Sequence, residues 1–200
     1  MHALAESYDA GVGTLVTARL DLVPVSIELV EAVLAGNRSR AEVCVGAILP
    51  ALWPGRALVE RAFYASLEDI LSNPTNRLWG DRVMITREPP RRVVGSVVFH
   101  GAPDGEGSVE VAYGVEEDSQ RLGYATEATR ASVEWALTEG RANVVRAATP
   151  PWHFASQKVL ERCGMRRCGV RDSPLGDVWE YERRRAAAED ALLQMASPSS

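Results

Sequence analysis

The chain has 200 residues and a mass of 21.8 kDa, a size that suits one domain with a full hydrophobic core. Hydrophobic residues make up 46% of it and charged residues 24%, which excludes a disordered or fibrous protein. The net charge of −5 argues against a nucleic-acid partner, because such proteins carry a basic surface. No apolar run reaches the roughly 18 residues of a membrane span, and no basic segment of a signal peptide is present, so we expect a cytoplasmic protein without a membrane partner.

The three cysteines do not form a recognisable metal motif. They are Cys44, Cys163 and Cys168, and the last two have four residues between them, a spacing that no common zinc site uses. An odd number of cysteines without a secretion signal favours reduced thiols. We therefore expect no bound metal.

The first part of the chain predicts a loose N-terminal arm, one strand and two helices. The strand alternates partly between apolar and polar residues, and the first helix has the N-cap residue Ser26 and the terminating residue Gly36. Prolines at positions 50 and 54 indicate a loop between the helices. In chain order, the arm, the strand and the two helices occupy residues 1–13, 14–23, 26–36 and 56–71.

The second part of the chain changes to strand periodicity and then alternates between helices and strands. Turn sequences between the first three strands favour consecutive antiparallel pairing. The strands occupy residues 78–87, 92–100, 108–115, 143–148, 165–171 and 178–182, and the helices occupy residues 124–139 and 152–163. Residues 183–200 read as a partly helical or disordered tail, so we expect a single domain over residues 14–182.

The turn before the helix at residue 124 has the features of an anion site. The first turn of a helix leaves N–H groups free, and the helix dipole favours a negative charge there. Gly123 lets a ligand approach the backbone closely. The segment lacks the Gly-Lys-Ser/Thr ending of a P-loop and the three glycines of a dinucleotide motif. From these residues alone, an ordinary strand-to-helix turn is an equal alternative.

Several short motifs, in consistent order, resemble those of the GNAT acetyltransferase superfamily. Gln120–Ala125 matches each specified position of its Gln/Arg-x-x-Gly-x-Gly/Ala motif. The neighbouring motifs are similar to those of the branch of ribosomal-protein N-terminal (RimJ/RimL-like) acetyltransferases. They are the first strand at Thr17–Pro24, the fourth strand at Val109–Val115, the helix opening at Tyr124–Ala128 and the second cofactor motif at Ser156–Met165.

The resemblance implies an α/β fold of the α+β type, the GNAT acyl-CoA N-acyltransferase fold. Its mixed, mostly antiparallel sheet splays open near Val115 in the fourth strand, with helices on both faces and acetyl-CoA in the split. No metal is implied, because the thioester is already activated. The residues implied in cofactor binding are Gly114, Val115, Gln120, Arg121, Leu122, Gly123, Tyr124 and Ala125, the last five through N–H groups at the pyrophosphate.

The second cofactor motif departs from the family pattern at two positions. His153 stands where the family usually has Asn, and it either donates to the pantetheine, binds substrate or has no role. Leu160 stands where many relatives place a tyrosine acid. Ser156 is then the hydroxyl that could assist the leaving thiolate, or a helix residue bonded to backbone. Tyr113 is expected in the core.

Glu110 is the candidate general base, because acetyl transfer needs a neutral amine and a carboxylate can accept the ammonium proton. A surface salt bridge is its structural alternative. The function expected is N-acetyltransfer from acetyl-CoA to a primary amine, either a protein N-terminus or a small molecule. The alternative is a non-catalytic acyl-CoA-binding or sensor module of the same fold. A homodimer is the base-rate expectation.

Overall fold

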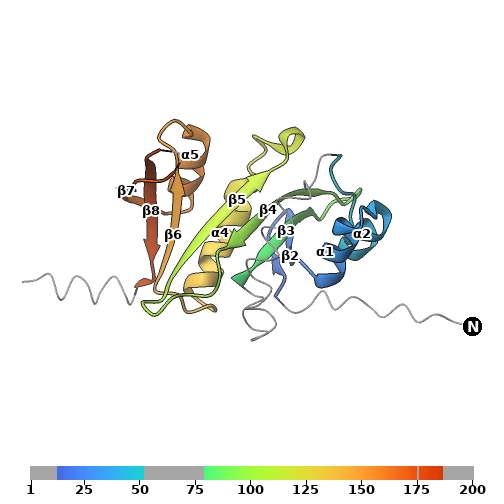
Figure 1. The fold of residues 1–200 in the computed structure, drawn as a ribbon, viewed down its shortest axis with the longest axis horizontal. Helices are drawn as coiled ribbons and strands as arrows, with labels where there is room; N and C mark the ends of the chain where they lie inside the picture. Colours follow the sequence, from blue (N-terminus) through green and yellow to red (C-terminus); the bar gives the residue numbers. More distant parts are fainter. Residues whose placement is uncertain (1–12, 52–78, 175, 187–200) are drawn as a thin grey trace, which may run out of the picture.

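The computed structural model describes residues 13–51, 79–174 and 176–186. One sheet has eight strands in the order β1-β2-β3-β4-β5-β6-β8-β7 (Figure 1). The strands are β1 (Leu15–Val16), β2 (Leu20–Pro24), β3 (Asp81–Thr86), β4 (Val93–Phe99), β5 (Ser108–Val115), β6 (Val144–Thr149), β7 (Arg166–Arg171) and β8 (Val178–Arg184). The helices are α1 (Ile27–Leu34), α2 (Arg38–Val45), the short 3-10 helix η2 (Glu117–Ser119), α4 (Tyr124–Leu137) and α5 (Phe154–Arg162).

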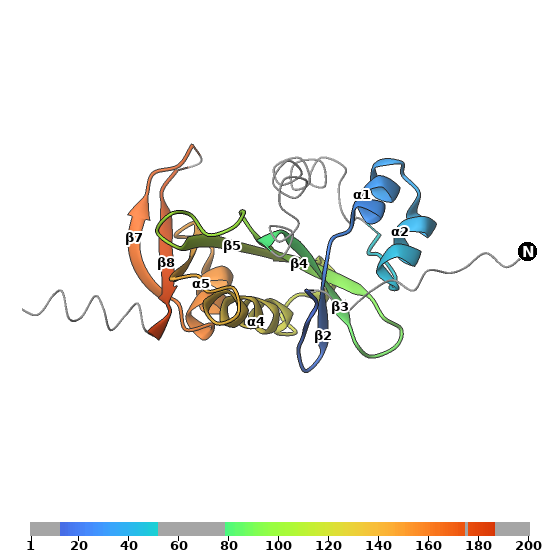
Figure 2. The same ribbon diagram turned by 90° about the horizontal axis from the view of Figure 1, so that it is seen from below.

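The sheet is mixed and mostly antiparallel, as expected. Of the neighbouring strands, β5 and β6 pair in parallel, and each other pair is antiparallel. Helices cover both faces, with α4 and α5 on one and α1 and α2 on the other (Figure 2). Alternate residues of β3 enter different cores: Met84 packs in the cluster under α4, whereas Val83 and Ile85 pack with α1 and α2. The expected GNAT-type architecture is confirmed.

The hairpin at the start of the described chain corrects one prediction. A single strand was expected over residues 14–23, but β1 and β2 are two strands joined by a turn at Thr17–Arg19. The main-chain N–H of Thr17 donates to the Leu20 carbonyl at 2.8 Å, and the Thr17 hydroxyl accepts from the N–H of Leu20 at 3.0 Å, closing the turn. A side chain that bonds nearby backbone in this way competes with continued strand pairing.

The segment after β2 contains one predicted and one unpredicted helix. Ser26 caps α1 as expected, accepting from the N–H of Leu29 at 3.1 Å, and Gly36 follows its end with a φ of 66°. Asn37 then caps α2, accepting from the N–H of Arg40 at 3.0 Å. The sequence pattern does not predict α2. Only Ala41 and Val45 of this helix are buried, so it lacks the repeated apolar positions that indicate a helix.

The later elements match their predictions closely, and β8 continues to Arg184, two residues beyond the expected end at 182. Trp79 is buried in the core, with its ring centre 5.2 Å from that of Phe99 and 4.7 Å from that of Trp135. The expected arm over residues 1–13 lies outside the described residues except for Gly13, and so does the expected helix over residues 56–71. The expected tail over residues 183–200 begins instead as the end of β8, and its part from residue 187 on lies outside the described residues.

Gly95 allows β4 to approach β5 closely. A Cβ atom at this position would lie 2.2 Å from the carbonyl oxygen of Gly114 and 3.0 Å from the Cα of Val115, so no side chain fits without moving the backbone. Because β5 forms one wall of the split described below, this close approach also sets the position of that wall.

We expect Gly95→Ala to lower the free energy of unfolding by at least about 2 kcal/mol in urea denaturation, because overpacking forces backbone shifts. Gly105→Ala is the control, since a Cβ at Gly105 has nothing within 4 Å. Its effect should stay within about 0.5 kcal/mol. Equal losses in the two variants would contradict the close approach of β4 and β5.

Candidate active site

The sheet opens into two arms where β5 and β6 part. Their parallel pairing is confined to Ser108–Glu110 of β5. Beyond it, β5 continues beside β4 to Val115, while β6 continues beside β8 to Thr149. Figure 1 shows the two arms diverging upward. The split thus begins at Glu110, earlier than the expected position near Val115, and β5 is the strand expected as the fourth.

The turn between β5 and α4 exposes main-chain N–H groups. Gln120, Arg121, Leu122 and Gly123 are all exposed. Gly123 has a φ of 87°, and Arg121 has a φ of 63°, a conformation that non-glycine residues adopt with strain. Within the described residues, the N–H groups of residues 121–125 donate to no main-chain acceptor. Together with the dipole of α4, they form a site suited to an anion such as pyrophosphate.

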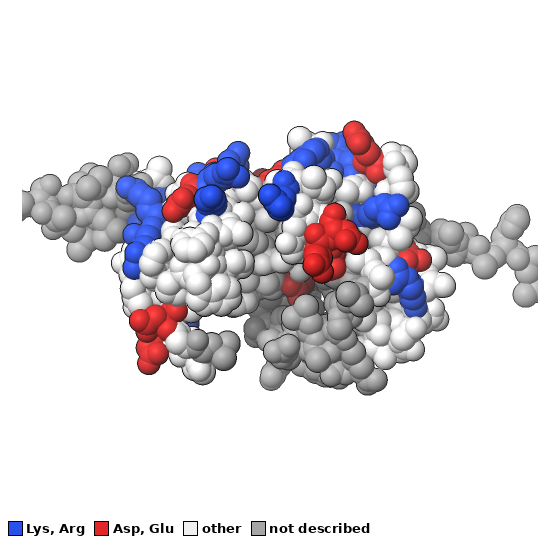
Figure 3. All heavy atoms as spheres, turned by 90° about the horizontal axis from the view of Figure 1, so that it is seen from above, with Lys and Arg blue, Asp and Glu red and all other residues white. Residues whose placement is uncertain are grey.

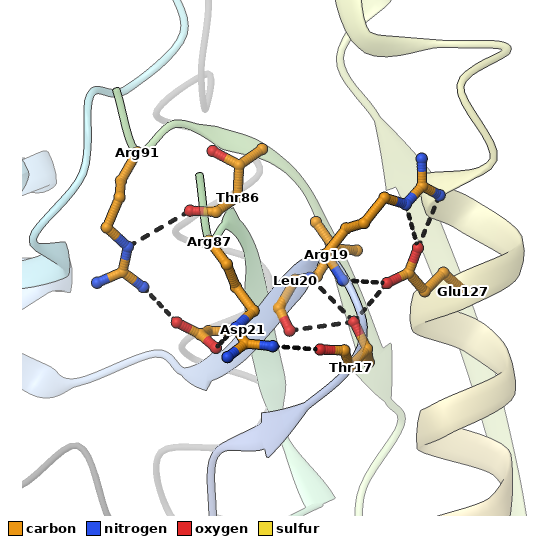
Figure 4. Close-up of polar contacts among 8 residues, drawn as sticks. All are labelled: Thr17, Arg19, Leu20, Asp21, Thr86, Arg87, Arg91 and Glu127. Atoms are coloured by element: carbon orange, nitrogen blue, oxygen red, sulfur yellow. Dashed lines mark hydrogen bonds and ion pairs between the residues drawn. The ribbon is translucent and has the colours of Figure 1, made fainter. Parts of the chain in front are cut away.

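One carboxylate joins this turn to the β1–β2 hairpin (Figure 4). Glu127 lies in the first turn of α4, and its Oε1 accepts from the Thr17 hydroxyl at 2.6 Å and from the Arg19 N–H at 2.8 Å. Its Oε2 lies 2.7 Å from both Nε and Nη2 of Arg19. Because the Glu127 side chain is only 17% exposed and makes several charged hydrogen bonds, this contact is stronger than an ordinary surface ion pair.

Arg19 also contacts the turn directly. Its Nη1 donates to the carbonyl of Leu122 at 3.0 Å, and its guanidinium carbon lies 4.7 Å from the ring centre of Tyr124. Burial alone would raise the pKa of Glu127, but hydrogen bonds from Thr17 and Arg19, with the charge of Arg19, lower that pKa overall. The ionised carboxylate therefore holds the hairpin against the turn.

The predicted cofactor residues before the turn lie at the end of β5. The side-chain amide of Gln120 donates to the carbonyl of Val115 at 3.1 Å, which braces the strand end against the turn. Gly114 is exposed on the same strand. Direct contact of Gly114, Val115 and Gln120 with the cofactor stays a prediction.

Glu110 lies at the closed end of the split and faces a cavity of about 400 Å³. Its side chain points away from the α4 core, because it alternates with the buried residues Val109 and Val111. Its Oε1 lies 3.5 Å from Arg171, which contacts Glu180 at 3.1 Å. The ionisable lining of the cavity comprises His100, Asp104, Glu110, Arg146, Arg171 and Glu180. The candidate base thus faces an open space while paired with a guanidinium.

The second cofactor motif begins α5 on the other arm. His153 precedes the helix without a side-chain capping bond, is exposed, and stacks near Trp152 with 5.7 Å between ring centres. Trp152 is 73% exposed and is not a core residue. Ser156 is half-buried, and its Oγ lies 2.9 Å from the hydroxyl of Tyr113 on β5. Tyr113 packs against the core as predicted, but its hydroxyl contact with Ser156 was not predicted.

Asp81 is an ionisable residue whose environment the sequence pattern does not predict. It begins β3 opposite Val98, and the alternation of β4 places it on the same sheet face as His100. Burial raises the pKa of Asp81 to about 6, and nearby His100 opposes that rise. The sequence does not indicate this burial, because residues 78–87 predict an ordinary strand that includes Asp81.

Three observations on the described residues bear on metals and partners. Over the described ranges, no group of three or more His, Cys, Asp or Glu residues is placed to hold a metal ion. Likewise, none of the helices described is both long and apolar enough to span a bilayer. On the face seen from above, basic and acidic side chains are intermixed, unlike the continuous basic surface of a nucleic-acid-binding protein (Figure 3).

Residues 19–166 match the family model of the acetyltransferase (GNAT) domain. The chain belongs to the GNAT acetyltransferases. A relative from Bacillus subtilis (strain 168), the uncharacterized N-acetyltransferase YjdG, is 27% identical over 150 residues, which are 75% of this chain and 88% of the relative. This GNAT protein is therefore an acetyl-CoA-dependent N-acetyltransferase.

Two solved structures show the same GNAT fold. The ribosomal-protein-S5-alanine acetyltransferase from Vibrio fischeri has a TM-score of 0.63 and 15% identity, covering 86% of this chain and 97% of its own. RimL, the ribosomal L7/L12 α-N-protein acetyltransferase, was solved in complex with coenzyme A. It has a TM-score of 0.62 and 13% identity, covering 87% of this chain and 99% of its own. In this GNAT chain, the split and the exposed N–H groups suit acetyl-CoA, which carries the same coenzyme A group.

We expect Glu127→Gln to weaken binding of coenzyme A about tenfold, or ~1.4 kcal/mol, because the turn loses its charged anchor. Calorimetric titration measures this affinity. Glu31→Gln is the matched control, since Glu31 forms an ion pair with Arg40 at 3.7 Å far from the turn, with both side chains more than half exposed. Equal affinities of the two variants would contradict a role for Glu127 in holding the turn.

Asp81 should make stability depend on pH. The pKa of Asp81 in the folded state, about 6, lies above its unfolded value of 3.8, so the folded state binds the proton more tightly. This protonation stabilises the folded state fully below pH 3.8, and the stabilisation is lost as pH rises through 6. We expect Asp81→Asn to be more stable than the wild type by about 1–2 kcal/mol at a pH of about 8, and equal to it at a pH of about 3.5. Urea unfolding at both values measures this.

The exposed residue Asp172 provides the control for that experiment. Asp172→Asn should leave unfolding free energies close to those of the wild type at both pH values, because exposed charges contribute little. A difference between Asp81→Asn and the wild type that does not change with pH would contradict the raised pKa of Asp81.

Proposed function

We propose that the protein transfers the acetyl group of acetyl-CoA to a primary amine that enters the cavity beside Glu110. The position of Glu110 carries this proposal. It lies where β5 and β6 part, at the inner end of the split, and faces a space of about 400 Å³. A donor that enters from the turn side and an acceptor that enters through the cavity would meet at this point.

In this mechanism, Glu110 is the general base. Its carboxylate takes a proton from the acceptor ammonium, directly or through water, and leaves a neutral amine. The amine nitrogen then bonds to the thioester carbonyl carbon, and the carbon–sulfur bond breaks. The excess proton on nitrogen passes to water, and coenzyme A leaves as a thiolate that is later protonated. Because Arg171 contacts Glu110 at 3.5 Å, the ammonium group competes with its guanidinium for the carboxylate.

Ser156 assists the leaving sulfur in this proposal. It lies in the first turn of α5, on the arm opposite β5, in the second cofactor motif. A hydroxyl is a very weak acid, so its contribution is a hydrogen bond to the developing thiolate rather than the transfer of a proton. The N–H groups of residues 121–125 would bind the pyrophosphate, and His153 would lie near the pantetheine or the acceptor.

We infer that the acceptor is the α-amino group of a protein N-terminus. Two proteins of the same fold are, by name, acetyltransferases of the ribosomal proteins S5 and L7/L12. The exposed residues Arg146 and Arg171 line the cavity, so a chain end can approach it from the surface. Small-molecule amines are the competing acceptors in the same test.

The test is calorimetric titration with acetyl-CoA, followed by a thiol-release assay over N-terminal peptides, the same peptides with blocked N-termini, and small amines. Release with free but not blocked peptides supports the proposal. Release with small amines alone would overturn the acceptor class. Binding of acetyl-CoA without release in any reaction would contradict the proposed transfer reaction on these acceptors.

We expect Glu110→Gln to lower kcat about 100-fold, because the general base is lost, while affinity for acetyl-CoA changes less than about twofold. Thiol release and calorimetry measure the two quantities. Glu180→Gln is the matched control, because Glu180 lines the same cavity and contacts the same Arg171 at 3.1 Å, but belongs to β8 rather than to the point where β5 and β6 part. Equal loss of kcat in both variants would assign the effect to Arg171 rather than to a base.

A further inference from the structure

A pair of hydroxyl groups bridges the two arms of the split. Tyr113 belongs to the part of β5 that has left β6, and Ser156 belongs to α5, which follows β6. The Tyr113 oxygen lies 2.9 Å from Oγ of Ser156 and 3.1 Å from the Ser156 carbonyl oxygen. The phenol therefore contacts both a hydroxyl and a carbonyl of the residue that we place beside the leaving sulfur.

The usual source of a hydroxyl in this motif is absent. Leu160 occupies the position where many relatives have a tyrosine, and its side chain is fully buried in the core. Tyr113 approaches the same motif from the opposite arm. The phenol and the serine hydroxyl are thus the two hydroxyl groups that meet at this end of α5.

The two hydroxyl protons can be arranged in two ways. If Tyr113 donates to the Ser156 carbonyl, Ser156 donates to Tyr113, and no proton points to the ligand. If Tyr113 donates to Oγ instead, the Ser156 proton is free to bond an acceptor in the split. A negative sulfur favours the second arrangement, because a hydrogen bond to the charged form stabilises it. The change moves no proton between residues.

We propose that Tyr113 is a positioning residue for thioester cleavage, which directs the Ser156 hydroxyl toward the departing sulfur of coenzyme A. The proposal rests on the proposed function, in which Ser156 lies beside that sulfur. Burial raises the pKa of Tyr113 to about 12, so the phenol keeps its proton at the pH values where the enzyme works. Tyr113 thus acts through its hydrogen bond and does not supply the thiolate with a proton.

The direct test needs no acceptor amine. The pKa of the coenzyme A thiol bound to the protein is measured from the ultraviolet absorbance of its thiolate as pH is raised. We expect Tyr113→Phe and Ser156→Ala each to raise this thiol pKa by about one unit relative to the wild type. The double variant should raise it no further than Ser156→Ala alone, because both substitutions remove the same hydrogen bond.

Tyr181→Phe is the matched control, because it removes a phenol hydroxyl from the same core, where Tyr181 is buried. It should leave the thiol pKa unchanged. In thiol-release assays, Tyr113→Phe should lower kcat about tenfold with little change in the KM for acetyl-CoA. A purely packing role would leave both the thiol pKa and kcat unchanged, since phenylalanine fills nearly the same space.

Two results would overturn the proposal while leaving the proposed function intact. One is an unchanged thiol pKa in Tyr113→Phe, whether or not Ser156→Ala raises it, and the other is additive rises in the double variant. Failure of the wild type to bind coenzyme A would instead contradict the proposed function, and this proposal with it. Each variant's circular dichroism spectrum and unfolding midpoint would show that it is folded.

Discussion

The carboxylate of Glu127 fixes the turn on which the rest of the site depends. It is hydrogen-bonded to Thr17 and Arg19, more than a hundred positions earlier in the chain, and Arg19 reaches on to the carbonyl of Leu122. The turn itself contains two residues with positive φ, Arg121 and Gly123, so it has little intrinsic preference for this shape. The contact with the hairpin supplies the missing constraint and leaves the N–H groups of the turn exposed.

The split in the sheet is the second requirement, and it follows from where strand pairing ends. Strands β5 and β6 pair over Ser108–Glu110, and each then keeps a different neighbour. Glu110 lies at the closed end, while Tyr113 and Ser156 meet across the open part. The proposed base and the proposed hydroxyl pair therefore occupy different positions along one opening, as a reaction that joins a donor and an acceptor requires.

Much of this arrangement follows from local sequence patterns. The alternation in β4 and β5, the cap at Ser26 and the glycine turn before α4 all indicate their structures, since each depends on residues close in sequence. Other features depend on contacts between distant residues. The hairpin turn needs the Thr17 hydroxyl to bond Leu20, and the Glu127 contact needs two segments to meet. The direction of the Tyr113 hydroxyl depends on where α5 packs, which periodicity does not encode.

The most direct measurement is the change in amide chemical shifts when acetyl-CoA is added to the isotopically labelled protein. We expect the largest shifts at residues 121–125, with a second group along β5 from Val111 to Val115, where the strand has left β6. Unchanged amides in the turn, or shifts confined to surfaces away from the split, would contradict the central claim that this turn and this split bind acetyl-CoA.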